Sequence, residues 1–505
     1  MEVSASRCET DKSRSLSRGC ETYISAPFLD AWETDRSMCG IIGVAGVPDA
    51  SRITYLGLYS LQHRGQESAG MVAVDGAGVA RSHRGMGLVS DVFGESVLAG
   101  LPGDVAIGHT RYSTAGSSVL ANAQPILAGY REGPLALGHN GNLTNAEALR
   151  SDLVAKGSIF QTSSDSEVLI HLIARSEARE PEDQLLDALE RVEGAYSLVV
   201  TIGRTLYAIV DPRGFRPLWL GKLGTGYVVA SETCALDLIG AATVRELEPG
   251  EFLRIQGSPP ELDRLPPLPA KPHQRCIFEL VYFSRPDSTI FGRSVDRVRR
   301  ALGRELAKEH AAPGTDCVFS VPDSSNAMAL GFAEQSGLKL EHALIRNHYV
   351  GRTFINPTQA ARNAKVKIKF NPVREVLQGK KVVVVDDSLV RGTTSRELVS
   401  MIRQAGAKEV HFRVASAPIT GPCYYGIDTP TKSELIASSH SLEQIRQHLG
   451  VETLGYLSLD GMLRAAGGDA TEFCHACFSG EYPTKIPDDT QNARNAAPLQ
   501  VTMAV

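Results

Sequence analysis

The stretch 380–406 places two adjacent carboxylates in front of a glycine turn. A run of valines ends at Asp386 and Asp387, and after a short loop a helical pattern begins with the capping-box spacing Thr394-x-x-Glu397. The backbone N–H groups of such a turn converge on one point, where the helix dipole favours an anion. The pattern predicts a phosphate-binding turn whose candidate donors are Arg391, Gly392, Thr393 and Thr394.

The paired acids suit ribose hydroxyls and a hard cation such as Mg²⁺. An ordinary strand-to-helix turn with two incidental acids would share part of this pattern. A second polar loop, 320–329, also joins an expected strand to an expected helix, although Pro-Asp-Ser-Ser is equally typical of a plain helix start. Between the two loops, the stretch 347–377 is either a solvated basic face or a lid over a polyanion, with Arg352, Arg362, Lys365, Lys367 and Lys369.

Cys39 enters a short apolar, glycine-bounded run and is a candidate nucleophile. A buried core thiol would look the same, because unpaired cysteines are often buried. Four polar motifs downstream favour chemistry: SLQHRGQESAG (60–70), HTRYSTAG (109–116), HNGNLTN (139–145) and SSDSE (163–167).

Cys474 and Cys477 form a Cys-x-x-Cys pair, which alone fits half a zinc site, a redox pair or chance. Cys276 and Cys423 could complete a set of four thiolates, which suits either Zn²⁺ or an iron–sulfur cluster. Spacing does not choose between the two. We expect no role for the remaining four cysteines, which are Cys8, Cys20, Cys234 and Cys317.

The first half reads as many short strands with a few helices, which predicts a layered α+β domain ending near residue 256. We expect strands at 39–47, 71–76, 105–113, 135–143, 196–203 and 206–211, and helices at 53–62 and 166–178. Six prolines stiffen a linker at 257–275. The second half alternates and predicts a parallel α/β sheet, with helices at 295–306, 327–336 and 395–405 and strands at 316–323, 380–387 and 409–416.

A chain of 505 residues is longer than one hydrophobic core normally accommodates, so we expect two main domains. A net charge of −5 does not favour binding to nucleic acid or to an anionic membrane, and no apolar run reaches the roughly 20 residues of a membrane span. Nine cysteines in so long a chain are not a disulfide framework, which favours a reduced, cytoplasmic setting. Residues 486–505 are polar and are expected to be disordered.

Residues 1–38 lack the apolar region of a secretory signal and carry more acids than a transit peptide. We interpret them as a propeptide or as an upstream segment that is not translated. A hypothesis follows that translation starts at Met38 and that an aminopeptidase removes this residue. If mass spectrometry of the native protein detected any peptide from residues 1–37, this hypothesis would be contradicted.

The first-half motifs resemble the glutamine amidotransferases with an N-terminal cysteine nucleophile, and the 380–406 turn resembles type I phosphoribosyltransferases. Together, residues 39–485 resemble the amidophosphoribosyltransferases. The resemblance implies an α+β N-terminal-nucleophile (Ntn) glutaminase domain of four αββα layers at 39–256. It implies, after the linker at 257–275, an α/β type I phosphoribosyltransferase domain at 276–485.

By the same resemblance, Cys39 is the nucleophile, and the Asn140 side chain and the Gly141 N–H form the oxyanion hole. Arg111 pairs with the α-carboxylate of glutamine and Asp165 with its α-ammonium group. Ser324, Asp386 and Asp387 contact one Mg²⁺ per subunit. The residues implied to bind phosphoribosyl pyrophosphate are Asp386, Asp387, Arg391, Gly392, Thr393 and Thr394.

The motifs YFSRPDS, PCYYGIDTP and FCHACFSGEYPT resemble the iron–sulfur branch of this family. One [4Fe–4S] cluster per subunit, structural and remote from both sites, is then implied on Cys276, Cys423, Cys474 and Cys477. A homotetramer and feedback inhibition by purine nucleotides are implied too.

The implied activity is that of a pentosyltransferase. Glutamine is hydrolysed, and its ammonia reacts with phosphoribosyl pyrophosphate to give 5-phosphoribosylamine, pyrophosphate and glutamate, the first committed step of purine synthesis. A glutamine amidotransferase for another sugar phosphate is the alternative, but it should lack the Asp-Asp…Gly-Thr-Thr turn. A non-catalytic phosphoribosyl pyrophosphate sensor should have lost Cys39, Asn140 or Asp165, and all three are present.

Overall fold

The computed structural model describes residues 38–112, 118–348, 369–429 and 431–488. The predictions for 1–37, for most of the basic stretch (349–368) and for most of the C-terminal tail therefore lie outside the described residues. Within the described ranges, no helix combines the length and apolar character needed to cross a bilayer.

Two antiparallel sheets form the centre of the first half. One has the strand order β11 (Ala242–Glu246), β9 (Trp219–Leu223), β10 (Gly226–Ala230), β1 (Gly40–Ala45), β4 (Val105–Arg111), β2 (Ser68–Val74) and β3 (Ala80–Met86). The other has the order β13 (Glu261–Arg264), β12 (Phe252–Gln256), β8 (Thr205–Val210), β7 (Gly194–Ile202), β6 (Gly133–Leu143) and β5 (Ile126–Tyr130).

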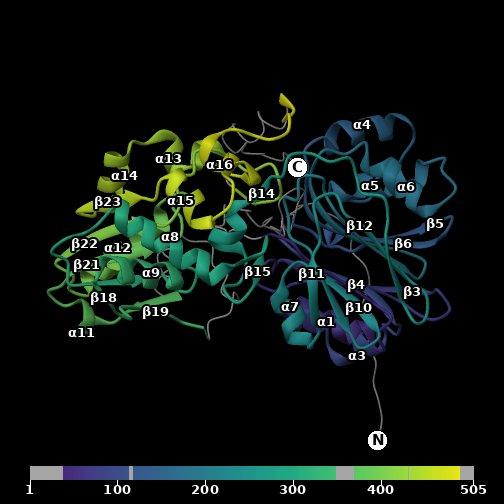
Figure 1. The fold of residues 1–505 in the computed structure, drawn as a ribbon, viewed down its shortest axis with the longest axis horizontal. Coiled ribbons are helices and arrows are strands. Elements are labelled where there is room, and N and C mark those ends of the chain that lie inside the picture. The colour runs from purple at the N-terminus through teal and green to yellow at the C-terminus, as the bar shows by residue number, and fades with distance from the viewer. Residues whose placement is uncertain (1–37, 113–117, 349–368, 430, 489–505) are drawn as a thin grey trace, which may run out of the picture. The chain divides into compact units, whose positions relative to one another are not determined.

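Helices cover the outer faces of both sheets (Figure 1). On one side lie α1 (Ala50–Ser60) and α7 (Thr233–Ile239), and on the other α4 (Ala146–Ala155), α5 (Ser166–Arg175) and α6 (Pro181–Leu189). Apolar residues of both sheets share one core, and each helical layer has a core of its own. The four-layer αββα architecture is therefore confirmed. It arises because strands such as β1 are buried on both faces.

The second half contains a parallel five-stranded sheet, as predicted. Its order is β18 (Lys339–Leu340), β17 (Cys317–Ser320), β21 (Lys381–Asp386), β22 (Glu409–Val414) and β23 (Thr453–Tyr456). Alternate valines of β21 point to opposite faces. Val383 and Val385 pack with α8 (Val295–Glu309) and α9 (Asn326–Ser336), while Val382 and Val384 pack with α12 (Thr393–Gln404).

One local prediction needs correction. Helix α12 has Gly392 as its N-cap, so the capping box predicted at Thr394 and Glu397 does not form its cap. Gly392 has φ 78°, a left-handed conformation that glycine adopts at no steric cost and that turns the chain into the helix. In the proline-rich stretch, β13 adds an edge strand to the second sheet, where flanking prolines are tolerated.

Helices α8 and α9 approach each other through two glycines. A Cβ on Gly303 would lie 1.9 Å from the Met328 carbonyl oxygen, and one on Gly331 would lie 2.0 Å from that of Arg300. Because backbone atoms form both contacts, a side chain at either position must push the helices apart.

We expect Gly303→Ala to lower the midpoint of thermal unfolding. Over-packing costs about 1–3 kcal/mol, which exceeds the roughly 1 kcal/mol that alanine gains over glycine within a helix. Differential scanning calorimetry measures the shift. Gly129→Ala is the control, since a Cβ there meets nothing within 4 Å. An unchanged midpoint for Gly303→Ala would contradict the close helix approach.

Candidate active sites

Cys39 lies just before β1 and is buried. Its Sγ is 3.9 Å from the carbonyl oxygen of Tyr112. Burial raises the pKa of this thiol to about 11, although the Tyr112 hydrogen bond and the positive charge of Arg111 oppose the rise. The thiol is therefore protonated at neutral pH, and a base is needed to activate it.

Asn140 and Gly141 lie in β6. The Asn140 side chain is fully buried, and in the described part of the chain neither its amide oxygen nor its amide nitrogen has a hydrogen-bond partner. Leaving a buried polar group unsatisfied costs about 1–3 kcal/mol, so such groups are rare and typical of functional sites. Gly141 has φ 149°, and a Cβ would lie 2.0 Å from the Ala195 carbonyl oxygen.

Arg111 and Asp165 lie close enough to Cys39 for their charges to act on its thiol. Arg111 ends β4 and forms a buried ion pair with Glu67. Asp165 precedes α5 and accepts a hydrogen bond of 2.9 Å from the Leu143 backbone N–H, which ties it to β6. The structure thus brings the five predicted glutaminase residues to neighbouring positions.

Sequence reasoning missed a buried group of charged residues behind Cys39. The group consists of Arg64, Arg216, Glu232 and Glu279, and all four side chains are fully shielded from solvent. Arg64 stands within the motif 60–70, which could have drawn attention to it. The other three occur far along the chain, and no spacing pattern links them to Cys39.

The predicted phosphate-binding turn follows β21. Asp386 ends the strand, Asp387 follows it, and Gly392 caps α12. Ser324 belongs to the second loop, and its hydroxyl donates a 2.6 Å hydrogen bond to Asp387. Ser325 likewise donates to Asp386 at 3.3 Å. The two polar loops therefore meet, and both carboxylates are largely buried between them.

Arg391 forms an ion pair of 2.9 Å with Glu434. This partner also was not foreseen. Thr393 and Thr394 begin α12, where the first backbone N–H groups of a helix have no partner within it. The turn has the geometry to bind an anion in front of these groups.

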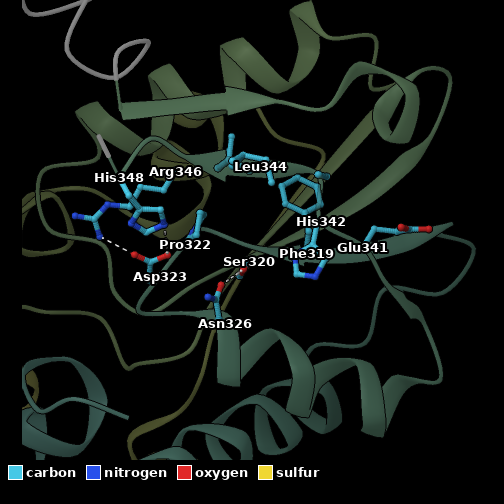
Figure 2. Close-up of a pocket in the computed structure, with 12 residues that line it drawn as sticks. Phe319, Ser320, Pro322, Asp323, Asn326, Glu341, His342, Leu344, Arg346 and His348 are labelled. Atoms are coloured by element: carbon cyan, nitrogen blue, oxygen red, sulfur yellow. Dashed lines mark hydrogen bonds and ion pairs between the residues drawn. The ribbon is translucent and has the colours of Figure 1, made fainter. Parts of the chain in front are cut away.

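Figure 2 shows a pocket at the start of the second loop. Asp323 forms ion pairs with Arg346 at 3.0 Å and with His348 at 3.8 Å, and Ser320 donates to Asn326 at 2.6 Å. Asp386 and Asp387 do not line it. The pocket thus adjoins the loop that holds Ser324 and the start of the basic stretch.

The four cysteines of the second half lie on neighbouring backbone segments. Cys276 in β14 (Arg275–Cys276) is the register partner of Cys474 in β24 (Phe473–Cys474). The Cys477 carbonyl accepts hydrogen bonds from the N–H groups of Thr420 and Gly421, at 3.0 and 3.1 Å, just before Cys423. None of the four forms a disulfide within the described residues. The chain folds so that the segments carrying these distant positions lie side by side.

The side chains of these cysteines do not form a closed ligand cage. Over the described ranges, no three His, Cys, Asp or Glu side chains are arranged to hold a metal ion. Burial, together with the neighbouring Cys276 and Cys423 sulfurs, raises the pKa of Cys474 well above its usual value. The buried Arg216 acts in the opposite sense on Cys276 and Cys474.

The chain is similar to known proteins along most of its length. Residues 109–238 match the family described as a glutamine amidotransferase domain. Amidophosphoribosyltransferase 2 of Arabidopsis thaliana, a chloroplastic protein, is 52% identical, with 93% of this chain and 83% of that protein covered. Amidophosphoribosyltransferase of Bacillus subtilis is 50% identical, covering 90% of this chain and 95% of that protein.

Solved structures agree. The B. subtilis glutamine phosphoribosylpyrophosphate amidotransferase, complexed with ADP and GMP, has 49% identity and a TM-score of 0.83, over 90% of this chain and 99% of that one. A structure described as the allosteric regulatory enzyme of purine biosynthesis has a TM-score of 0.85 at 49% identity, over 91% of this chain and 100% of that one. With this identity over nine-tenths of its length and an Ntn-like sandwich joined to a parallel sheet, the chain belongs to the amidophosphoribosyltransferase family.

Proposed function

We propose that Cys39 attacks the carboxamide of glutamine and that the ammonia released is transferred to phosphoribosyl pyrophosphate bound at the Asp386–Asp387 turn. The products are 5-phosphoribosylamine, pyrophosphate and glutamate, in the first committed step of purine synthesis. The observation that carries this proposal is the fully buried amide of Asn140, which has no hydrogen-bond partner among the described residues and lies in the strand to which Asp165 is bonded.

The first half performs the hydrolysis. The Asn140 amide N–H₂ and the Gly141 N–H stabilise the oxyanion that forms when sulfur adds to the carboxamide carbon. Arg111 binds the α-carboxylate and Asp165 the α-ammonium group, which selects a free amino acid over a protein amide. Water then releases glutamate from the thioester and restores the thiol.

The base for Cys39 is its own α-amine, which titrates near pH 8. This amine is free only after the preceding residue has been removed. Met38 is fully buried, and its sulfur lies 2.9 Å from Nη1 of Arg216. A protease cannot reach a residue in this position, so we infer that removal precedes the folding of this region.

The second half performs the transfer. Arg391 and the N–H groups of residues 392–394 hold a phosphate, and Asp386 and Asp387 orient the ribose. The two carboxylates with the Ser324 hydroxyl make an oxygen donor set that fits Mg²⁺, which would neutralise charge on the departing pyrophosphate. Ammonia then attacks the ribose carbon that pyrophosphate leaves, and positioning suffices without a protein nucleophile.

We propose that Cys276, Cys423, Cys474 and Cys477 hold a [4Fe–4S] cluster. Four cysteine sulfurs on adjoining segments fit this group by donor chemistry, with Arg216 available to offset their negative charge. The cluster would supply cross-links between three distant segments. His475 is not a ligand in this proposal.

The domain limits that we propose are 39–256 for the glutaminase, 257–275 for the linker and 276–485 for the transferase. A homotetramer, inhibition by purine nucleotides and a cytoplasmic location complete the proposal. The relative solved with ADP and GMP supports nucleotide control. The proposed nucleophile and cluster ligands are thiols that must stay reduced. This requirement supports the proposed cytoplasmic location.

Cys39→Ala is expected to abolish glutamine-dependent formation of phosphoribosylamine but to retain the ammonium-dependent reaction, because only the first site needs the thiol. Anaerobic assays with each nitrogen donor measure both rates. Cys317→Ala, which removes a buried thiol of β17, should keep both. Retention of glutamine use by Cys39→Ala would contradict the assigned nucleophile, and a wild type inactive with both donors would contradict the proposed function.

Asn140→Ala is expected to lower kcat for glutamine by about 10²- to 10³-fold, the loss typical of one oxyanion donor. Ammonium-dependent activity should be unchanged. Asn145→Ala is the matched control, since the side chain of Asn145 bonds to Arg191 and Glu193 backbone groups instead. A loss confined to KM would assign Asn140 to substrate binding rather than to the transition state.

Cys423→Ser is expected to eliminate bound iron and acid-labile sulfide from anaerobically purified protein. The wild type should contain about four of each per chain. Elemental analysis and the visible absorption spectrum give the measurement, and Cys317→Ser, a buried cysteine of β17, should retain the full content. Zinc without sulfide in the wild type would overturn the cluster assignment.

A further inference from the structure

Arg64 connects the backbone of the nucleophile to a buried pair of carboxylates. Its Nε donates to the Cys39 carbonyl oxygen at 3.0 Å. Its Nη1 donates to Glu232 at 2.6 Å and to Glu279 at 3.1 Å, and its Nη2 donates to Glu279 at 2.8 Å. The guanidinium is thereby oriented in its plane by three separate acceptors.

Glu279 comes from the second half of the chain, in the short helical turn Glu279–Phe283. Besides Arg64, it accepts hydrogen bonds from the Ser284 hydroxyl at 2.9 Å and from Arg216 at 3.4 Å. Glu232 accepts from His63, Ser288 and the Arg285 N–H, at 2.7, 2.7 and 3.0 Å. Burial opposes the charge on Arg64, but Glu279 and Glu232 outweigh it and raise its pKa, so the residue stays charged.

The carbonyl that Arg64 holds belongs to the peptide group next to the reacting residue. Holding this carbonyl fixes the peptide plane from which the Cys39 Cα projects, and so restricts where Sγ and the α-amine can lie. Both must point toward the carboxamide for attack and proton transfer to occur. Of the three hydrogen bonds that Arg64 donates to carboxylates, two go to Glu279 and one to Glu232, so most of the hold on Arg64 comes from the second half.

We propose that Glu279 is a positioning residue for glutamine hydrolysis. Through Arg64, this second-half carboxylate sets the pose of the first-half nucleophile, so the glutaminase site is completed only by the transferase half. The inference rests on the proposed function of Cys39 and adds a residue that touches no substrate.

The test uses Glu279→Gln in the full chain. Glutamine replaces one accepting oxygen by an N–H₂ group that faces the Arg64 donors, so the two-point hold is lost. We expect kcat for glutamine to fall about 10- to 100-fold, the loss typical of small misplacements. KM for glutamine and the ammonium-dependent rate should stay at wild-type values.

A second readout follows the thiol itself. The rate at which iodoacetamide alkylates Cys39, measured by mass spectrometry of its peptide, should fall in Glu279→Gln because the amine no longer faces the sulfur. The alkylation is measured without phosphoribosyl pyrophosphate, so it does not depend on the transfer reaction. It therefore separates failure of the inference from failure of the proposed function, which a wild type inactive with both nitrogen donors would reveal.

Glu246→Gln is the matched control. Glu246 is another carboxylate that joins the halves, accepting from the Phe291 and Gly292 N–H groups at 3.0 Å each, and neither Arg64 nor Cys39 is among these partners. It should keep the wild-type alkylation rate and the wild-type ratio of glutamine to ammonium use.

An unchanged glutamine rate in Glu279→Gln would overturn the proposal, and so would an equal loss of both activities with a normal alkylation rate. If Glu279→Gln does not yield folded protein, Arg64→Lys replaces it. An ammonium group keeps the charge but cannot hold three acceptors in one plane. Selective loss of glutamine use supports the proposal, and full glutamine use in Arg64→Lys overturns it.

Discussion

The structure depends on a buried group of four charges, Arg64, Arg216, Glu232 and Glu279, that joins the two halves. The charges sum to zero and every partner is within hydrogen-bonding reach, which is the condition for burying ions at all. Removing one member of such a pair costs about 3–5 kcal/mol because its partner is left uncompensated. The buried arginines of the first-half sandwich are therefore paired partly with a carboxylate from outside it. Part of its electrostatic balance is supplied by the second half.

A second set of contacts joins the halves near the cysteines. Asn142 of β6 donates to the Tyr424 carbonyl at 3.0 Å, and Arg216 donates to that of Tyr425 at 2.6 Å. Both carbonyls directly follow Cys423. A group that cross-links the four cysteines would hold this loop against the strand that carries Asn140.

Much of this arrangement was predictable where function imposes local sequence. The valine run, the two acids and the glycine of the 380–406 turn lie within one strand–loop–helix unit, so their order alone predicted that strand, turn and helix. The parallel sheet and the layered α+β class followed from apolar patterning, whereas the αββα order of the layers came from the resemblance to a family. The identity of the N-cap was missed because Thr394 and Glu397 fit a capping box, whereas the left-handed φ of Gly392 depends on the folded loop.

Long-range polar pairs were not predictable. Arg64 and Glu279 are 215 positions apart, and neither shows periodicity or a motif that refers to the other. The same holds for Arg111 with Glu67 and for Arg391 with Glu434, where charge alone left many candidate partners. The convergence of Cys276, Cys423, Cys474 and Cys477 needed the resemblance to a family, since spacing along the chain says nothing about proximity in space.

One contact between the halves has no side chain in it. Gly426 packs on Gly141 so closely that a Cβ on Gly426 would lie 2.8 Å from the Gly141 carbonyl carbon, and the two main chains meet directly. A side chain at position 426 would therefore displace the strand that carries Asn140 and Gly141. Recombination among relatives is constrained accordingly: a chimera that takes residues 39–256 from one parent and 276–485 from another keeps this seam closed only if the second parent carries glycine at position 426. A residue almost 300 positions away from the strand thus limits which halves can be joined.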